Sequence, residues 1–477
     1  MRNAPHRLAM NSLASWLKST AQQSPDALAL LSSQGQWTYR ELAAQARSGA
    51  AFLQDNGFCP VEGSGDQPGR IAVMAGSAND LARAALACSV AGIALLPLDP
   101  LTVEARWPNL RALGGDRLRR LSPLPLMLPD AASGECKATR FDPIALVIVT
   151  SGSEGPPKAV MLTHANLDYA AAASNERLPL RPGDLWLGCL PLHHIGGLST
   201  LYRCLRAGAA LLLHDRFDAM QVWYDLHAHP VTHISLVPTM LARLLDVAAG
   251  ATPPAALRHA LIGGAALSRS LFERARASGW PLNPTWGMSE CAAQASTLCQ
   301  PGEHWQEGEV GTLLPGFEAR VNAEGRIALR GPQVMAGYLN PESQMGVGLK
   351  DGWLITADLG RIDAAGRITL LGRADDMFNS GGVKVHPLEI ESCLAACPGV
   401  SDVAVTALPD PLWGDVLVAL LIGSANPEQV DGWSRQHLAP AQRPRYLLKV
   451  EQLPRNVLGK IERPALRALA HQVRSAR

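Results

Sequence analysis

The chain of 477 residues is longer than one ordinary domain and suits one large domain with one small one. Its hydrophobic residues make up 47% and its charged residues 18%, a composition that excludes a mainly disordered protein. Lysine and arginine together number 43 against 42 aspartate and glutamate residues, a balance that argues against a nucleic-acid polymer as partner.

The cysteines and the apolar runs indicate a reduced, soluble protein. Nine cysteines are scattered without a Cys-x-x-Cys pair, which argues against a disulfide framework and a zinc ribbon. Residues 1–19 lack a continuous apolar core, so we expect no secretory signal. The longest apolar runs, such as 144–149 and 209–213, are far shorter than the ~20 residues of a membrane-spanning helix. The sequence therefore predicts a cytoplasmic protein without membrane insertion.

Helices and short apolar strands alternate from the N-terminus to about residue 262. In chain order, the predicted elements are a strand ending near residue 31, a helix over 40–56, a strand over 70–74, a helix over 79–91, and strands over 92–98, 144–150, 185–190, 209–214, 233–237 and 259–262. Thr38, with Glu41 three residues later, has the spacing of a capping box at the start of the first helix. This alternation is typical of a mostly parallel sheet with helices on both faces.

The pattern changes after about residue 305. Short alternating strands, broken by Gly, Asp and Asn, predict a small antiparallel or barrel-like element over 311–320, 325–331, 360–363 and 366–371. A further unit combines predicted helices over 387–396 and 428–437 with strands over 400–407 and 415–422. We therefore predict an α/β fold with doubly wound sheets in a large N-terminal domain, 1–373, and a small mobile α+β C-terminal domain, 374–477.

The segment Thr150–Lys158 joins a predicted buried strand to a lysine through residues rich in Gly and Ser. Glycines let backbone N–H groups converge, hydroxyl groups donate hydrogen bonds, and Lys158 supplies positive charge, so the composition suits an anion-binding loop. The spacing of a Walker P-loop is absent. A flexible surface turn is the alternative for such a loop taken alone.

Seven motifs, in order along nearly the whole chain, resemble those of the adenylate-forming enzymes, which include acyl-CoA synthetases, firefly luciferase and the adenylation domains of peptide synthetases. They are the phosphate loop 150–158, the acyl-site loop 191–197, the adenine-side loop 263–267, the Trp-Gly-Met-Ser-Glu segment 286–290, the segment 353–359, the hinge segment 372–376 with its following loop 380–382, and the C-terminal lysine motif 454–460. One such motif carries little weight, but seven in the right order are a specific signature.

The resemblance implies a reaction in two steps. A carboxylate attacks the α-phosphate of ATP and releases pyrophosphate, and a thiol then takes the acyl group and releases AMP. Lys460, Glu290 and Lys158 are implied as catalytic residues, with Glu290 also binding Mg²⁺. The implied nucleotide-binding residues are Thr150, Ser151, Gly152, Ser153, Glu154, Gly155, Lys158, Gly264, Ala265, Ala266, Trp286, Gly287, Met288, Ser289, Asp358 and Arg373. Taken alone, Lys460 reads as a solvated lysine, and Asp358 has a turn residue as its alternative. For Trp286 taken alone, a core position and stacking on adenine are both open.

The resemblance also assigns the acyl side and the hinge. The implied substrate-binding residues are His194, Gly196, Gly197, Ser199 and Gly264, with His194 lining the pocket and not acting as a general base. Asp375 is the implied hinge, and Gly381 and Gly382 are implied to line the pantetheine passage. The chain departs from the family pattern at Glu154, Ala159 and Ala357, and Glu154 adds a negative charge beside the triphosphate.

The segments 191–199 and 211–217 look most like those of o-succinylbenzoate–CoA ligases of menaquinone biosynthesis, so we expect ATP, Mg²⁺ and CoA as cofactors and co-substrates. Arg203 or Arg206 could face a second carboxylate of the acid, although arginines on a helix are more often solvated. Another aryl- or acyl-CoA ligase, a ligase that loads a carrier protein, and a non-catalytic nucleotide-binding module remain as alternatives. A homodimer is a further possibility.

Overall fold

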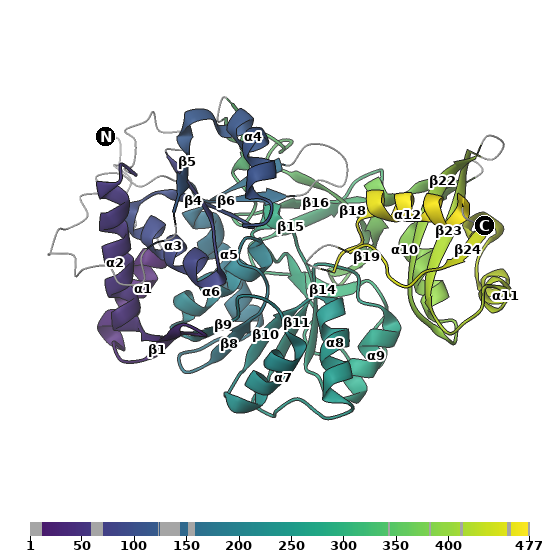
Figure 1. Cartoon of the computed structure of the whole chain (residues 1–477), viewed down its shortest axis with the longest axis horizontal. Helices are drawn as coiled ribbons and strands as arrows, with labels where there is room; N and C mark the ends of the chain where they lie inside the picture. Colours follow the sequence, from purple (N-terminus) through teal and green to yellow (C-terminus); the bar gives the residue numbers. More distant parts are fainter. Residues whose placement is uncertain are drawn as a thin grey trace.

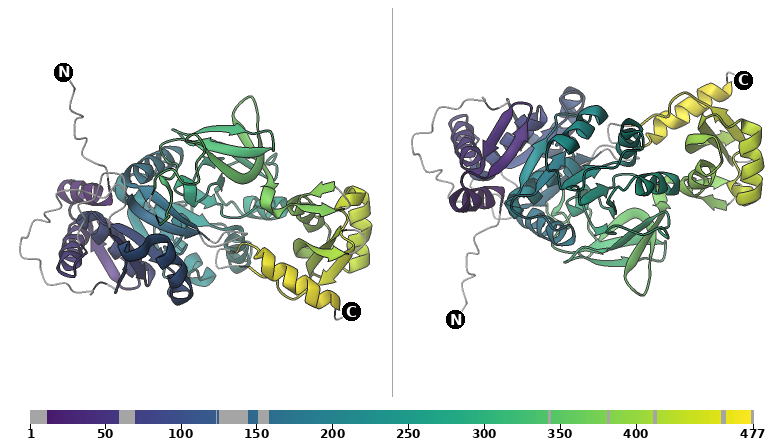
Figure 2. Two further views of the ribbon diagram at one scale, coloured as in Figure 1. Left: turned by 90° about the horizontal axis from the view of Figure 1, so that it is seen from above. Right: turned by 90° about the horizontal axis from the view of Figure 1, so that it is seen from below.

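The computed structural model describes residues 12–58, 70–122, 124, 144–150, 158–341, 344–380, 383–410, 414–455 and 459–475. Its strands form two large sheets in the N-terminal domain and one small sheet toward the C-terminus. The small sheet lies at one end of the long axis in Figure 1, and the views in Figure 2 show the same separation. The predicted α/β fold with a large and a small domain is confirmed.

The first sheet is mixed and has the strand order β17-β7-β6-β4-β3-β5. Its strands are β3 (Ile71–Ala75), β4 (Ala94–Leu98), β5 (Leu118–Leu121), β6 (Ile144–Thr150), β7 (Lys158–Thr163) and β17 (Gly337–Tyr338). β3 to β6 run parallel, as the sequence predicts. β7, which the sequence did not predict, pairs antiparallel with β6, and β17 pairs antiparallel with β7. The predicted phosphate loop therefore connects two adjacent antiparallel strands.

The second sheet contains the remaining parallel strands. They are β1 (Leu28–Ser32), β8 (Leu185–Gly188), β9 (Ala210–Leu213), β10 (His233–Leu236), β11 (His259–Ile262) and β12 (Leu282–Trp286), with β2 (Gly35–Thr38) antiparallel at the edge. Apart from their end residues, the strands predicted over 185–190, 209–214, 233–237 and 259–262 are confirmed. The carboxyl ends of β10, β11 and β12 meet at one edge of this sheet, where ligands bind in open α/β sheets.

The antiparallel strands after residue 305 continue the second sheet beyond β12. They are β13 (Ser296–Thr297), β14 (Glu309–Leu313), β15 (Glu318–Val321), β16 (Arg326–Arg330), β18 (Leu354–Ile362) and β19 (Arg367–Arg373). The single strand predicted over 311–320 is wrong, because a turn divides it into β14 and β15. In that turn Phe317 N donates to Leu314 O at 3.3 Å, and Gly316 has φ +92° after Pro315. Proline followed by a left-handed glycine is the pattern of a type II turn.

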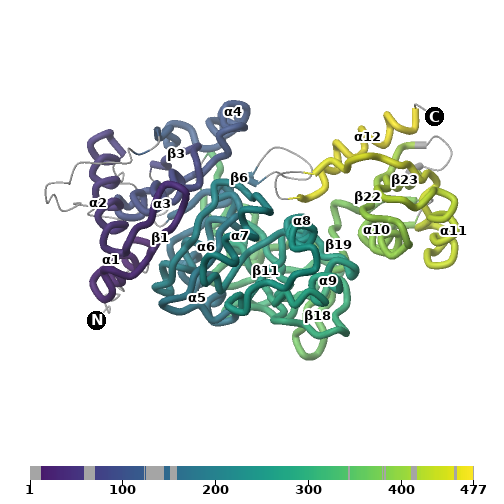
Figure 3. The backbone as a smooth tube through the Cα atoms, turned by 60° about the horizontal axis from the view of Figure 1, so that its bottom comes forward, coloured from purple at the N-terminus to yellow at the C-terminus, as the bar shows by residue number. Residues whose placement is uncertain are grey.

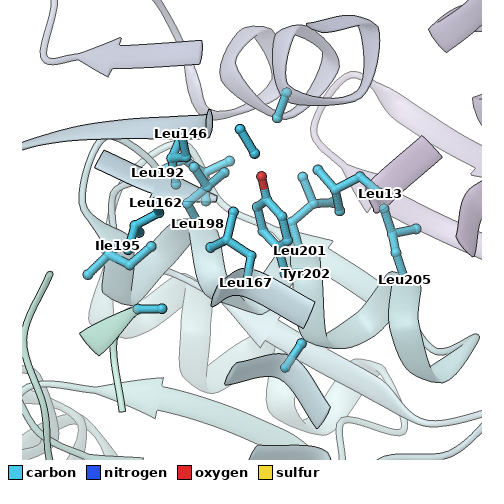
Figure 4. Packing of buried hydrophobic residues seen from close by; sticks show 14 of the residues in the cluster. Leu13, Leu146, Leu162, Leu167, Leu192, Ile195, Leu198, Leu201, Tyr202 and Leu205 are labelled. Carbon is cyan, nitrogen blue, oxygen red and sulfur yellow. The ribbon is translucent and has the colours of Figure 1, made fainter. Parts of the chain in front are cut away.

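The main hydrophobic core lies between the two large sheets. The helices that pack there are α1 (Leu13–Gln23), α2 (Tyr39–Asp55), α3 (Ala78–Ala91), α5 (His164–Arg177) and α6 (Ile195–Ala207). α2 begins with the predicted capping box, in which Glu41 accepts from Thr38 N at 2.8 Å. Figure 4 shows Leu198, Leu201, Tyr202 and Leu205 of α6 among residues of α1, α5, β6 and β7. α6 is therefore fixed by the core, together with the loop that precedes it.

Further helices cover the outer faces of the two large sheets. α4 (Val103–Gly114) packs on the first sheet. α7 (Ala219–Ala228), α8 (Pro238–Ala248) and α9 (Arg269–Ala277) pack on the second. No helix within the described ranges is long and apolar enough to cross a membrane.

The small C-terminal sheet carries helices on both faces. Its strands are β20 (Phe378–Ser380), β21 (Val383–Val385), β22 (Val400–Asp410), β23 (Gly414–Gly423) and β24 (Tyr446–Lys449). α10 (Pro387–Ala395) and α11 (Pro427–His437) pack on one face, and α12 (Arg463–Ser475) packs on the other. β24 and α12 are absent from the predicted elements, because this arginine-rich end of the chain reads as a solvated segment. Leu466 and Ala470 form the buried stripe of α12.

Candidate active site

The candidate site includes the residues at the carboxyl end of β12. The strand ends at Trp286, and Gly287 follows. A Cβ atom at Gly287 would lie 1.9 Å from the carbonyl oxygen of Ala293, so only glycine fits here. The chain then turns back in a short 3₁₀ segment, Ser289–Cys291, which places Glu290 just beyond the strand. Met288 and Ser289 therefore lie at the edge where the resemblance predicts nucleotide contacts.

Glu290 and Lys158 both contact Tyr338, a residue that belongs to none of the seven motifs. The Tyr338 hydroxyl donates to Glu290 Oε1 at 2.8 Å. Lys158 Nζ lies 5.0 Å from the centroid of the same ring. The structure thus brings two of the three predicted catalytic residues together. Tyr338 carried no sequence signal beyond a Gly-Tyr pair, because its role depends on a two-residue strand, β17.

Asp358 forms a second polar cluster with Trp286 and Arg373. The Trp286 indole N–H donates to Asp358 Oδ2 at 2.9 Å, and Arg373 Nη1 lies 3.5 Å from Asp358 Oδ1. Arg373 also donates two hydrogen bonds to Asp375, at 2.9 and 2.7 Å. Burial raises the pKa of Asp358, whereas Arg373 and the Trp286 donor lower it. Trp286 is only 5% exposed, and its stacking on adenine stays a prediction.

Substituting Trp286 by phenylalanine tests whether the indole N–H holds Asp358. An aromatic ring is kept, but the N–H donor to the charged Asp358 carboxylate is lost. We therefore expect KM for ATP to rise about tenfold with little change in kcat. The loss also removes an interaction that lowers the pKa of Asp358, so the acid limb of kcat/KM for ATP should move to higher pH. Trp223→Phe on the outer helix α7 is the matched control. An unchanged KM and pH profile in Trp286→Phe would contradict this role.

The C-terminal lysine motif reaches the same cluster. Desolvation and the neighbouring Arg373 guanidinium lower the pKa of Lys460, whereas Asp376, Asp358 and Asp375 raise it. Lys460 is exposed, and its ammonium interacts electrostatically with these charges in this orientation of the small domain. The structure therefore brings the third predicted catalytic residue to Asp358 and Arg373.

Further contacts join the small domain to the large one. A Cβ atom at Gly459, which has φ +71°, would lie 2.0 Å from Thr239 Oγ1 at the start of α8, so the chain before Lys460 lies directly against that helix. Figure 3 shows the chain before α12 reaching back toward α8. The Ser392 hydroxyl of α10 donates to Glu307, which also accepts from Arg269 N at 3.1 Å. The Ser392–Glu307 contact could not be predicted from the sequence, because its two residues lie in no motif.

The adenine-side loop follows β11, the neighbour of β12. Gly264 has φ +79°, a conformation that favours glycine, and a Cβ atom there would lie 3.2 Å from Val237 Cγ1. Gly264 and Ala266 are exposed, and Ala265 is partly exposed. This loop therefore presents backbone to solvent at the shared edge of β11 and β12.

The acyl-site loop ends at His194, which is the residue before α6. The rings of His193 and His194 lie 4.4 Å apart. Burial lowers the pKa of His194 to about 4, with smaller contributions from His193 and Arg106. His194 is therefore neutral at physiological pH and suits a pocket-lining role.

The small residues of α6 are constrained by packing. A Cβ atom at Gly197 would lie 2.3 Å from the Pro191 carbonyl oxygen, and the buried Ser199 hydroxyl donates to Gly196 O at 3.2 Å. Arg203 is 3% exposed, with its guanidinium 5.3 Å from the Trp186 ring centroid. Arg206 pairs with Asp168 at 2.7 Å. The geometry does not support either arginine as the anchor of a second carboxylate.

Some predicted residues lie outside the described part of the chain. They are Ser151, Gly152, Ser153, Glu154, Gly155, Gly381 and Gly382. Thr150, which ends β6, donates through its hydroxyl to the Lys158 carbonyl oxygen at 3.3 Å. The two ends of the phosphate loop are thus joined directly.

Comparison with known proteins agrees with this site. The family model described as AMP-binding enzyme matches residues 17–109 and 113–339, and the model of its C-terminal domain matches 389–460. A 2-succinylbenzoate–CoA ligase of Bacillus licheniformis is 30% identical, over 94% of this chain and 98% of that protein. One from Bacillus mycoides is 35% identical, over 69% of this chain and 70% of that protein.

Solved structures show the same similarity. An o-succinylbenzoate CoA synthetase from Bacillus subtilis, in complex with its acyl-adenylate intermediate, matches with a TM-score of 0.82 and 28% identity, over 94% of this chain and 97% of that one. ATP-bound MatB from Rhodopseudomonas palustris matches with a TM-score of 0.82 and 25% identity, over 96% and 98%. The chain belongs to the AMP-binding family of adenylate-forming enzymes. Within that family it is an acyl-CoA ligase.

Proposed function

We propose that this enzyme is an ATP-dependent o-succinylbenzoate–CoA ligase. The observation that carries the proposal is the similarity to the Bacillus licheniformis 2-succinylbenzoate–CoA ligase, which extends over nearly the full length of both chains. The motifs of the ATP site, the acyl-site loop and the C-terminal lysine are all present in one chain. A role in menaquinone biosynthesis follows from this substrate.

The nucleotide lies, in this proposal, along the shared edge of β11 and β12. Asp358 accepts hydrogen bonds from the ribose hydroxyls, because its carboxylate is held in place by Trp286 and Arg373. Exposed backbone at Gly264 and Ala266 borders the adenine. The loop that ends at Lys158 donates to the phosphates, since a lysine and converging N–H groups suit anions.

The residues present also fit a magnesium ion bound together with ATP. No group of three or more His, Cys, Asp or Glu side chains that could hold a metal occurs among the described residues. Magnesium needs no such cage, because it prefers one or two carboxylates with phosphate oxygens and waters. Glu290 is the carboxylate that would hold it, and Tyr338 bonds only one of its two oxygens. When bound, the ion would neutralise charge on the phosphates.

Adenylation requires two anions, the acid and the α-phosphate, to approach each other. Lys460 lies at the Asp358–Arg373 cluster, where its ammonium offsets the repulsion between them. Lys158 supplies a second positive charge, at the Tyr338 ring. The attacking carboxylate oxygen forms a bond to the α-phosphorus, the bond to pyrophosphate breaks, and the acyl-adenylate results.

Thioester formation completes the reaction. The CoA sulfur attacks the acyl carbon, loses its proton, and displaces AMP. We propose that the small domain turns at Asp375 between the two steps, so that 1–373 and 374–477 act as separate bodies. In the present orientation Arg373 holds Asp375 through two hydrogen bonds, which would break during that rotation. Gly381 and Gly382 would then line the passage for pantetheine.

A panel of acids tests the proposed substrate. Pyrophosphate release is measured with o-succinylbenzoate, benzoates and fatty acids, and the products formed with CoA and with a carrier protein are identified by mass. We expect o-succinylbenzoate to give the highest kcat/KM and its CoA thioester as product. Turnover with another acid but not with o-succinylbenzoate would refute o-succinylbenzoate as the substrate, while the enzyme would remain an acyl-CoA ligase. ATP binding without pyrophosphate release for any acid would favour a non-catalytic module, and an acylated carrier protein would identify the rival acceptor.

We also propose that the enzyme acts in the cytoplasm, where ATP and CoA are available. A homodimer stays a prediction, and light scattering of the purified chain measures it directly. A molar mass of a single chain would contradict it.

A further inference from the structure

Tyr338 touches two charged residues that belong to different sequence motifs. Its hydroxyl donates to Glu290 Oε1 at 2.8 Å, and Lys158 Nζ lies 5.0 Å from its ring centroid. A cation over a tyrosine ring is attracted by the negative face of the ring. Tyr338 thus binds the Glu290 carboxylate through its hydroxyl and the Lys158 ammonium through the face of its ring.

The backbone around Tyr338 is fixed from both sides. β17 pairs with β7, with Tyr338 opposite Val160, and Leu339 N donates to Ala159 O at 2.8 Å. On the other side, Met335 N donates to Glu290 O at 2.8 Å. The segment 335–339 therefore connects the 3₁₀ turn of Glu290 with the strand that begins at Lys158.

The ring of Tyr338 is confined as well. A Cβ atom at Gly348 would lie 2.4 Å from the ring, and Gly348 has φ +94°, so this neighbour must be glycine. Tyr338 N donates to Val347 O at 2.9 Å. The ring has little room to rotate away from Glu290 and Lys158.

We propose that Tyr338 is a positioning residue that holds the Glu290 carboxylate and the Lys158 ammonium apart, each ready for its own ligand. Without Tyr338 between them, Glu290 and Lys158 could form an ion pair with each other. That pair would neutralise the charges that Mg²⁺ and the phosphates of ATP need. The hydroxyl bond occupies one lone pair of Oε1 and leaves Oε2 for Mg²⁺. The ring face keeps Lys158 near the phosphates and away from the Glu290 carboxylate.

This inference rests on the proposed ATP and magnesium chemistry, so the test begins with binding. ATP affinity is measured by calorimetry at several Mg²⁺ concentrations for the wild type, Tyr338→Phe and Tyr338→Leu. Tyr338→Phe keeps the ring face but loses the hydroxyl. We expect the Mg²⁺ concentration that half-saturates tight ATP binding to rise about tenfold in Tyr338→Phe, with metal-free ATP binding unchanged. Tyr338→Leu should in addition weaken metal-free ATP binding, because Lys158 loses the ring.

The controls separate this inference from the proposed function. Tyr224→Phe, at a 65% exposed site on α7, removes a tyrosine hydroxyl far from the site and should leave both measurements unchanged. A wild type whose ATP binding does not respond to Mg²⁺ would refute the magnesium role itself. A responsive wild type with an unchanged Tyr338→Phe variant would overturn the positioning role alone. If Tyr338→Leu does not fold, the result for Tyr338→Phe decides the question.

Discussion

Replacing Lys460 with alanine slows adenylate formation by about 10²–10³-fold, the loss typical of removing one preorganised group that stabilises developing charge. The reason is electrostatic: in this orientation the Lys460 ammonium interacts with the charges of Asp358, Arg373 and the acidic hinge residues. The second step has no such requirement, because the acyl-adenylate no longer needs two anions to meet. We therefore expect thioester formation from supplied acyl-adenylate and CoA to change less than about threefold.

Two single-turnover assays measure the effect of Lys460→Ala. Pyrophosphate release reports the first step, and thioester formation from synthetic acyl-adenylate reports the second. Lys449→Ala, at the exposed end of β24 in the same domain, is the matched control and should leave both rates unchanged. Equal losses in both steps would show that Lys460 supports the fold of the small domain or CoA binding instead.

Replacing Gly459 with alanine should also slow adenylation strongly, although no charge is removed. The new Cβ atom would lie 2.0 Å from Thr239 Oγ1, and φ +71° is a conformation that alanine adopts at a cost. Overpacking typically costs about 1–3 kcal/mol and a left-handed residue about 1–2 kcal/mol. Together they correspond to roughly a 30- to 5000-fold loss of the orientation that brings Lys460 to the site. We expect pyrophosphate release to fall within that range.

A double variant separates the two costs. Thr239→Ala removes the oxygen that the new Cβ atom meets, so Gly459→Ala with Thr239→Ala should recover about tenfold of the lost rate. The remaining loss is the backbone cost at residue 459. Gly432→Ala is the control, because a Cβ atom there meets nothing within 4 Å. A double variant no faster than Gly459→Ala would rule out the contact with α8 as the cause.

The sequence predicts most of this fold because its strands are continuous apolar runs. The run His259–Ile262 appears with its predicted bounds, and Thr38 and Glu41 cap α2 as their spacing indicates. The prediction fails where a few residues change the chain direction. Pro315 and Gly316 divide one predicted strand. α12 was missed because arginines lie among the apolar residues of the face that packs on the sheet, Leu466, Leu469, Ala470 and Val473.

The site residues also divide into those that the sequence predicts and those that only the structure reveals. Glu290, Asp358, Arg373 and Lys460 occupy motif positions, and the structure places them at two adjoining polar clusters. Tyr338 could not be found from the sequence, because it acts through β17, whose partner strand β7 begins nearly 180 residues earlier. Arg203 was a reasonable carboxylate anchor by charge alone, but its position on α6 turns it into the core. Only tertiary packing distinguishes these cases.

The most direct test of the account follows one oxygen atom from the acid to the nucleotide. The enzyme is given ATP, Mg²⁺, CoA and o-succinylbenzoate whose carboxylate oxygens are all heavy oxygen, and the AMP formed is weighed. Attack of the carboxylate on the α-phosphate, followed by cleavage of the acyl bond by the thiol, leaves one heavy oxygen in each AMP. We expect AMP with the mass of one heavy oxygen, together with pyrophosphate and the CoA thioester. Unlabelled AMP, or ADP and phosphate in its place, would contradict adenylation at this site.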